Sequence, residues 1–397
     1  MGDLPEPGAL APLFRLDPGT VYLNHGSFGA CPKPVAEAQA RLRDRMEADA
    51  VRFFVFDMWE LMDRARAALS PIVGAPPDGL VFVPNATTGV TTVLHNLRLG
   101  PGDEILVTGN EYTACVNNCK AAAARAGATV VTAPMPWPMP GPDAVIDAVL
   151  AHAGPRTRLA LVSLMTSATG LRLPIERLIP ALRDRGVPTL LDAAHGPGCV
   201  PMDLSAWAPD WATGNCHKWL FAPKGAAFLY VAEHRRAGFR PLVLSNDAER
   251  LEEASARTDR PAWQHEFDYT GTDDLTARMA IADAAAFLNT AVPGGREALM
   301  SANRAMALAG RDVVCARLGI EPPAPDGMIG PMCSLRLPSG EDPFALGRRL
   351  YERHRIQIPV WAGPGGGSLI TRLSAQVYNS PAQYAYLAEA LAAELRP

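Results

Sequence analysis

The sequence has no strong excess of charge of either sign. Its 397 residues include 37 Lys and Arg against 41 Asp and Glu, so the formal net charge is −4, and no block of Lys or Arg stands out. This balance gives no support for a nucleic-acid partner. The chain also has no signal-peptide pattern and no apolar run of membrane length, so no membrane partner is expected.

Cysteine is scarce and scattered. The seven cysteines are odd in number, which is not the pattern of a disulfide framework in a chain of this length. Cys115 and Cys119 fall on one face of a predicted helix, but no second pair of ligands follows, so both are interpreted as packing residues and no metal site is predicted. A reducing cytoplasm is the expected compartment.

Nucleotide-binding motifs are missing as well. No Walker A motif occurs, and the glycine run Gly363–Gly367 is not surrounded by the strand and helix of a dinucleotide fingerprint. The run is instead expected to form a mobile loop near Arg372.

What the chain does contain is the composition of a globular protein, with 48% hydrophobic and 20% charged residues. Its length predicts two domains. Residues Met1–Thr20, rich in Pro and Gly, are expected to form an arm against the surface. A helix is predicted over Pro34–Ser70, and its apolar stripe is interpreted as core or subunit contact.

From Leu80 onward, predicted strands alternate with helices. Strands are expected over Leu80–Val83, Glu104–Thr108, Thr129–Ala133, Arg158–Leu164, around Leu190 and Trp211, and after Gly225. Helices are expected from Asn85 and over Ala114–Ala126, Pro142–Ala153 and Pro174–Arg185. His234–Gln264 is expected to be irregular. The remaining predicted helices are Leu275–Asn289, Arg296–Leu318, Pro343–His354 and a last helix after Pro381. The remaining predicted strands are Ile329–Leu337 and Ser368–Ala375.

One stretch organises the rest. Asp192 follows the apolar run Thr189–Leu191, and Lys218 follows a second short apolar segment, both in glycine-containing loops. Ligands of open α/β sheets bind at the carboxyl ends of strands, and a lysine there can form an imine with an aldehyde. The spacing therefore predicts a cofactor site.

Asp192-Ala193-Ala194-His195, followed by Asn215-Cys216-His217-Lys218-Trp219, resembles the pyridoxal 5'-phosphate (PLP) signature of the class V aminotransferase family. With Tyr22–Gly29, the sequence is most similar to the isopenicillin N epimerase branch, over about Val21 to Tyr378. The resemblance implies the fold type I architecture, an α/β protein with a mainly parallel sheet in a large domain and a smaller α+β C-terminal domain. The implied boundaries are 1–20 for the arm, 21–265 for the PLP-binding domain and 266–397 for the small domain.

The resemblance also implies how the cofactor is held. Lys218 would form the Schiff base, Asp192 would pair with the pyridine nitrogen, and Tyr112 would stack on the ring. His195 and Ser167 would face the phenolic oxygen. The phosphate would be held by Ala86, Thr87, Asn215, His217 and, from a neighbouring chain of a homodimer with shared active sites, Thr272.

Several of these residues also have ordinary interpretations. Asn85–Gly89 opens a helix, which offers free N–H groups to an anion but also fits a simple N-cap. Tyr112 fits a surface tyrosine, and Arg372 a salt bridge at a sheet rim. Desulfurases of this family usually carry Asn where Ser167 stands, and a hydroxyl residue is common where Asn215 stands.

The substrate implied by the resemblance is an amino acid or peptide-like molecule. Arg372 would bind its carboxylate in bidentate fashion, with Asn24 and His25 nearby. Lys218 would remove the Cα proton. If a second acid, Tyr112 or His25, returned a proton on the opposite face, the enzyme would be an epimerase or racemase, which is the favoured interpretation.

Other outcomes stay open. A sulfur leaving group at Cβ would make the protein a C–S β-lyase, and proton return to the cofactor would make it an aminotransferase. A desulfurase would need a cysteine in a flexible loop before Arg372, whereas Cys333 is expected inside a strand. An inactive binding protein with this fold is the remaining alternative.

Overall fold

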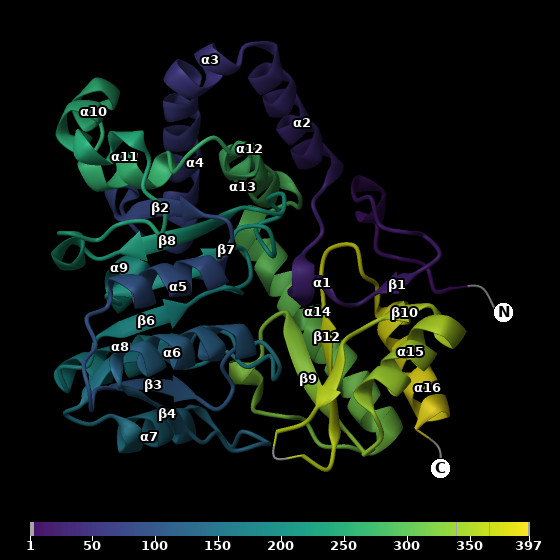
Figure 1. Cartoon of the computed structure of the whole chain (residues 1–397). Helices are drawn as coiled ribbons and strands as arrows, with labels where there is room; N and C mark the ends of the chain where they lie inside the picture. The colour runs from purple at the N-terminus through teal and green to yellow at the C-terminus, as the bar shows by residue number, and fades with distance from the viewer. Residues whose placement is uncertain (1–3, 339, 365, 396–397) are drawn as a thin grey trace.

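A seven-stranded sheet forms the centre of the larger part of the molecule (Figure 1). The computed structural model describes residues 4–338, 340–364 and 366–395. The strand order is β2-β8-β7-β6-β5-β3-β4, in which β8 runs antiparallel to β7 and β2 and the other pairs are parallel. The strands are β2 (Leu80–Val83), β3 (Glu104–Thr108), β4 (Thr129–Ala133), β5 (Thr157–Ser163), β6 (Thr189–Asp192), β7 (Trp211–Asn215) and β8 (Ala227–Val231).

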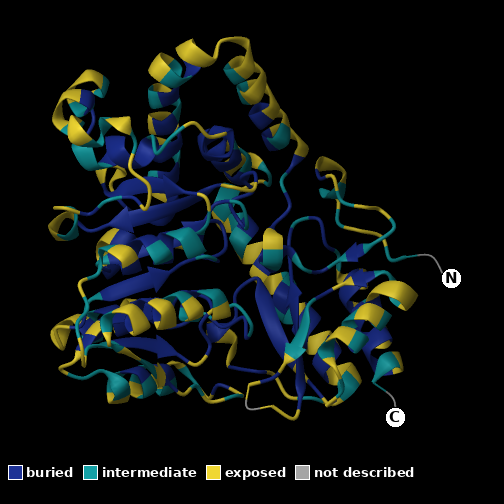
Figure 2. Cartoon of the chain, viewed as in Figure 1, coloured by how far each residue is buried: buried dark blue, intermediate teal, exposed yellow. Residues whose placement is uncertain are grey.

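Both faces of this sheet are covered, which explains why its strands are apolar runs and do not alternate with polar residues. In β2 the side chains of Leu80 and Phe82 join one hydrophobic cluster, and those of Val81 and Val83 join another. The inner strands β6, β7 and β8 are buried along their length, while the covering helices expose their outer faces (Figure 2). The predicted α/β fold with a mainly parallel sheet is confirmed.

The helices between these strands begin and end close to the predicted positions. They are α5 (Ala86–Asn96), α6 (Thr113–Ala126), α7 (Pro142–His152) and α8 (Ile175–Asp184). At the start of α5, the Asn85 side chain accepts a hydrogen bond from the Thr88 N–H at 2.9 Å, as an N-cap residue does. Short helices lie at α9 (Leu204–Trp207) and at η3 (Pro77–Gly79), η4 (Glu233–Arg235) and η5 (Asn246–Glu249).

A smaller antiparallel sheet, formed by C-terminal residues, carries Arg372. Its order is β11-β12-β9, and Arg372 on β12 lies opposite Ser334 on β9. The elements of this part are α14 (Gly295–Leu318), η6 (Asp326–Met328), β9 (Met332–Leu337), α15 (Pro343–His354), β10 (Ile356–Gln357), β11 (Val360–Ala362), β12 (Leu369–Ser374) and α16 (Pro381–Glu394). β9 begins three residues later than predicted, directly after Pro331, which has no N–H to donate to a ladder.

The N-terminal segment joins both parts. η1 (Ala11–Leu13) lies in the arm, where the Gly8 N–H donates to the Tyr378 carbonyl at 2.8 Å. β1 (Val21–Tyr22) then pairs in parallel with β10, and α1 (His25–Phe28) follows at the junction (Figure 1). Residues 1–3 of the predicted arm lie outside the described residues. The predicted domain boundaries stay a prediction.

Three helical predictions need correction. The helix predicted over Pro34–Ser70 is divided into α2 (Lys33–Ala48), α3 (Ala50–Arg52), the π-helical η2 (Phe53–Asp57) and α4 (Met58–Val73). The break falls at Asp49, whose backbone leaves the helical region and whose side chain caps the Arg52 N–H.

The other two corrections concern residues 234–290. The segment His234–Gln264 is not irregular throughout, because it contains α10 (Leu251–Thr258) and the start of α11 (Ala262–Asp268). The helix predicted over Leu275–Asn289 is divided at Ala280 into α12 (Thr276–Met279) and α13 (Ile281–Thr290). No helix in the described ranges combines the length and apolar character that a bilayer span requires.

Candidate active site

A cavity of about 410 Å³ lies where β5, β6 and β7 end and the smaller sheet faces them. Its lining includes ten of the residues singled out from the sequence: Ala86, Thr87, Tyr112, Ser167, Asp192, His195, Asn215, His217, Lys218 and Arg372. The structure therefore brings together most of the predicted site. Within the described residues, no cluster of His, Cys, Asp and Glu is arranged to hold a metal ion.

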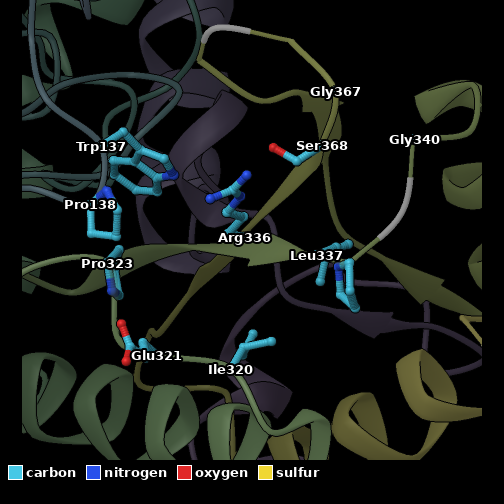
Figure 3. Close-up of a pocket in the computed structure, with 11 residues that line it drawn as sticks. Trp137, Pro138, Ile320, Glu321, Pro323, Arg336, Leu337, Gly340, Gly367 and Ser368 are labelled. Atoms are coloured by element: carbon cyan, nitrogen blue, oxygen red, sulfur yellow. The ribbon is translucent and has the colours of Figure 1, made fainter.

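A second cavity of about 530 Å³ lies elsewhere, between the Trp137-Pro138 loop and β9 (Figure 3). Arg336 and Ser368 reach into it, and Glu321 lies on another side. Its lining includes no lysine and none of the predicted site residues. It lacks the acid and lysine pair on which the cofactor prediction depends.

Asp192 ends β6 and is buried. Its Oδ1 accepts the Ala194 N–H at 2.8 Å, and the Cys115 thiol donates to its Oδ2 at 3.4 Å. Burial raises the pKa of the Asp192 carboxyl, while these two hydrogen bonds and the charge of Lys218 act in the opposite direction. The carboxylate is thus oriented from two sides and is stabilised by a nearby positive charge.

Lys218 lies in the turn that follows β7, with its Nζ 3.3 Å from His195 Nε2. Burial, followed by the charge of Arg372, lowers the pKa of Lys218 to about 8. A substantial fraction of this amine is therefore neutral near that pH. Gly29, at φ 68°, lets the end of α1 lie against the backbone of His217 and Lys218, because any Cβ at this position would lie only 2.2 Å from the His217 carbonyl oxygen.

The start of α5 faces the same cavity. The Ala86 N–H donates to Asn215 Oδ1 at 2.9 Å, so the Asn215 amide is oriented with its nitrogen away from that bond. His217 Nδ1 lies 3.0 Å from the Ala226 carbonyl and must be the donor there. Burial lowers the pKa of His217 to about 4. Its other nitrogen can donate to a phosphate only when the ring is protonated.

Arg372 is a fully buried cation on β12. Its Nη1 donates to the Ser167 carbonyl and its Nη2 to Ser27 Oγ at 3.1 Å, while its Nε has no partner. The guanidinium carbon lies 5.1 Å from the centre of the Trp361 ring. Burial lowers the pKa of Arg372 to about 10, so it remains charged at neutral pH.

No carboxylate of the described residues lies within salt-bridge distance of Arg372. A rim salt bridge, the ordinary interpretation of a strand arginine, is therefore not what the structure contains. Burying an unpaired charge is costly. The arrangement suits a binding site for an anion that arrives from solution.

Three predicted residues are not part of the lining of this cavity. His25 is fully buried, with Nδ1 2.7 Å from the Tyr378 hydroxyl and Nε2 3.1 Å from the Lys218 carbonyl, so both ring nitrogens are occupied. Asn24 accepts the Ser27 hydroxyl at 2.5 Å and orients that side chain. Thr272 is exposed on its own chain.

A second buried acid, next to this cavity, was not predicted from the sequence. Glu111 follows β3, and its Oε1 accepts the Thr108 hydroxyl at 2.7 Å and the Ser163 N–H at 3.0 Å. The pKa of Glu111 is raised to about 7, chiefly by burial and to a smaller extent by the charge of Asp192, while the hydrogen bonds from Ser163 and Thr108 act in the opposite direction. The position of Glu111 shortly after a predicted strand could have marked it as a site residue. The contribution of Trp361 and Cys115 to the cavity lining could not have been predicted, because it depends on packing between distant segments.

Comparisons with known proteins agree with this geometry. A family model described as aminotransferase class-V matches residues 22–307. The isopenicillin N epimerase of Amycolatopsis lactamdurans is 36% identical and the alignment covers 95% of each chain. A probable chloroplastic L-cysteine desulfhydrase of Arabidopsis thaliana is 29% identical over 94% of this chain and 83% of its own length. The cysteine desulfurase CsdA of Escherichia coli, at 20% identity, has the same fold with a TM-score of 0.78 over 97% of both chains.

Proposed function

The chain belongs to the class V aminotransferase family, whose cofactor is PLP, and from this premise we propose that it is an epimerase or racemase acting at Cα of an amino acid or peptide-like substrate. The single observation that carries the proposal is the buried guanidinium of Arg372, which has no carboxylate partner among the described residues and lines the same cavity as Asp192 and Lys218. The similarity to isopenicillin N epimerase supports the choice of reaction.

The residues of the cavity fit the cofactor chemically. A protonated pyridine nitrogen would give the buried Asp192 carboxylate the cationic partner that its environment favours. The Lys218 amine would bond to the cofactor aldehyde. The Thr87 N–H and the Asn215 amide nitrogen, which make no hydrogen bond among the described residues, would donate to the phosphate. The Ala86 N–H already donates to Asn215, and His217 would donate only in its protonated form. When bound, PLP supplies an electron sink for the charge left at Cα.

The residues of the chain then divide the work. Arg372 binds the substrate carboxylate, and Ser27 and the Ser167 carbonyl hold the guanidinium in place. Lys218 Nζ, partly neutral because of its lowered pKa, accepts the proton from Cα. Tyr112, which lines the cavity and is 47% exposed, is the candidate for the acid on the opposite face. His25, the other candidate, has no place in this scheme, since both its nitrogens are engaged.

A C–S β-lyase is the second candidate. The probable L-cysteine desulfhydrase among the relatives supports it, and elimination from Cβ needs no second acid at Cα. An aminotransferase and an inactive binding protein stay as alternatives. In a protein that binds no ligand, however, an unpaired buried arginine would lower the stability of the fold without serving binding.

A persulfide-forming desulfurase is disfavoured. Cys333 is fully buried inside β9, and burial raises the pKa of its thiol. Cys115, which lines the cavity, is buried too and donates to Asp192. Gly365, in the glycine loop before Arg372, lies outside the described residues, and the loop sequence contains no cysteine.

We also propose a homodimer with shared active sites, in which Thr272 of the partner subunit contacts the phosphate. Thr272 is exposed, and so is Phe28 at 68% on the cavity lining. A cytoplasmic location stays a prediction.

The reaction is tested by incubating the PLP-loaded protein with candidate amino acids in deuterated water. Deuterium at Cα, together with a mixture of stereoisomers and no release of ammonia, pyruvate or another 2-oxo acid, is the expected result. Release of pyruvate and ammonia would establish the lyase, and a 2-oxo acid formed in proportion to aminated cofactor would establish the aminotransferase. Lys218→Ala serves as the blank.

A further inference from the structure

One imidazole ring links the lysine to the residue that follows it. Trp219 is fully buried, and its indole Nε1 lies 3.1 Å from Nδ1 of His195. The other nitrogen of the same ring, Nε2, lies 3.3 Å from Lys218 Nζ. The indole N–H, the imidazole and the amine thus form a chain.

The first contact fixes which ring nitrogen carries the proton. An indole N–H can only donate a hydrogen bond, so His195 Nδ1 must present a lone pair to Trp219. A neutral imidazole carries one proton, which then has to be on Nε2. Burial lowers the pKa of His195 well below its usual value, and nearby positive charge acts in the same direction, so the ring is neutral. The groups facing it are Lys218, Arg372, His25 and His217.

The second contact then depends on the state of the amine. A charged ammonium has three N–H bonds and no lone pair, so it cannot accept the Nε2–H. A neutral amine can. We propose that Trp219 is a positioning residue that fixes the Nε2–H tautomer of His195 and thereby favours the neutral, nucleophilic form of the Lys218 amine. The inference rests on the proposed role of Lys218 in cofactor binding.

The same assignment restricts the chemistry. Because Nε2 carries the proton, His195 presents a donor to the cavity and cannot accept a proton from Cα. Proton removal is left to Lys218. The titratable and charged groups that face Lys218 besides His195 are Arg372 on β12, Asp192 on β6, Cys199 in the loop after β6 and Cys115 on α6.

The fold holds the indole in this position. Trp219 packs against His25 on α1, with ring centres 4.7 Å apart. On the backbone side, Gly198 at φ 76° approaches so closely that a Cβ there would lie 2.5 Å from the Trp219 carbonyl oxygen. The His25 ring thus packs against the indole, and the Gly198 backbone packs against the backbone of Trp219.

The tautomer can be read in the unsubstituted, cofactor-free protein. Nitrogen-15 NMR of protein labelled at its eight histidines, with His195 assigned by its loss in His195→Gln, distinguishes the two neutral tautomers and the charged ring. The Nε2–H tautomer at about neutral pH is expected. An Nδ1–H tautomer or a charged ring would overturn the proposal; the tautomer is read in the unsubstituted protein, and the His195→Gln variant serves only to assign the signal.

The effect on the amine is measured by lysine labelling. The chain has four lysines, Lys33, Lys120, Lys218 and Lys224, so competitive acetylation of the cofactor-free protein followed by mass spectrometry gives a titration curve for each. In Trp219→Phe, His195 Nε2 is free to accept from the ammonium. The midpoint for Lys218 should therefore rise by roughly one pH unit, which is about a tenfold lower reactivity below the midpoint.

Two controls make the labelling specific. Trp211→Phe removes another buried indole N–H, one that has no partner, and should leave the Lys218 midpoint unchanged. In a His195→Gln background, Trp219→Phe should add nothing, because an amide has no tautomer to fix. An unchanged midpoint in Trp219→Phe, or an equal shift in Trp211→Phe, would contradict the proposal. If reduction with borohydride traps PLP on another lysine, the proposed function fails while the tautomer result stands.

Discussion

Lys218, at the end of the large sheet, and Arg372, on the small one, are both cations on one cavity, but Lys218 is only partly buried whereas Arg372 is fully buried, and their surroundings differ. Lys218 has Asp192 close enough to favour its charged form, a neutral His195 at 3.3 Å and a pKa of about 8. Arg372 has neutral oxygen partners, an unpartnered Nε and a pKa of about 10. The first cation can lose its proton at working pH and can do chemistry; the second keeps its charge and can only bind. Four changes would break or sharpen this contrast.

The largest effect is expected at Arg372. Arg372→Met removes the partner of the substrate carboxylate and should lower kcat/KM by roughly 10²–10³-fold, as loss of a buried charge pair does. It also removes an unpaired buried charge, so the Tm of the cofactor-free protein should rise. Both are measured on one preparation, by the deuterium exchange assay and by calorimetry. Arg336→Met, at an exposed arginine on β9 (Figure 3), should change neither. A lower Tm with unchanged kcat/KM would assign Arg372 a purely structural role.

Asp192 is expected to come next. Asp192→Asn keeps an acceptor for the Ala194 N–H but loses the charge, so kcat should fall by roughly 10²-fold, in the range of other preorganised electrostatic contacts. Cys115→Ser, which keeps a donor beside Asp192, should alter kcat by less than about threefold. Steady-state rates of Cα deuteration measure both. Equal losses in the two variants would mean that cavity packing, and not charge, controls the rate.

A smaller effect is expected in the pH dependence of stability. Folding lowers the pKa of Lys218 from 10.5 to about 8, so below pH 8 both folded and unfolded chains carry the charge and the burial penalty is complete. Between about pH 8 and 10.5 the unfolded chain binds more protons, so the unfolding free energy of the cofactor-free protein should rise by a total of about 3 kcal/mol. Urea titrations across this range measure it. Lys218→Met should remove the rise; an identical slope in that variant would show that other groups cause it.

The smallest change is expected from Thr272. If the partner subunit's Thr272 donates to the phosphate, Thr272→Ala should weaken PLP retention by roughly tenfold, the lower end of the range for one hydrogen bond to a charged group. Equilibrium dialysis measures the affinity, with Thr270→Ala as the matched control. In mixtures of Thr272→Ala and Lys218→Ala chains, activity above that of either parent is expected from a shared site. Unchanged retention in a verified dimer would remove Thr272 from the phosphate site.

Local patterns made the large sheet and its site predictable. Apolar runs predicted β2 to β5 to within one residue and located β6, β7 and β8 without bounds, and the position of Asp192 and Lys218 after two of these runs placed both at one edge. The helix over Pro34–Ser70 was wrong because the capping preference of Asp49 exceeds the helical preference of its neighbours. β9 begins later than the apolar pattern predicts because Pro331 has no N–H to donate to the ladder.

The rest depended on contacts between distant segments. That Arg372 is left without a carboxylate follows from how β12 meets the Ser167 loop and Ser27, and no sequence window contains all three. His25 is turned to Tyr378, more than three hundred residues later, and so is kept from the cavity. The burial of Glu111 depends on Ser163 at the end of β5.

The most direct test of the account is to map where PLP bonds to the protein. The holoenzyme is reduced with borohydride, digested, and searched by mass spectrometry for the phosphopyridoxyl group on each of the four lysines. The account predicts the group on Lys218, with none on Lys33, Lys120 or Lys224. Modification of any other lysine, with Lys218 unmodified, would contradict it.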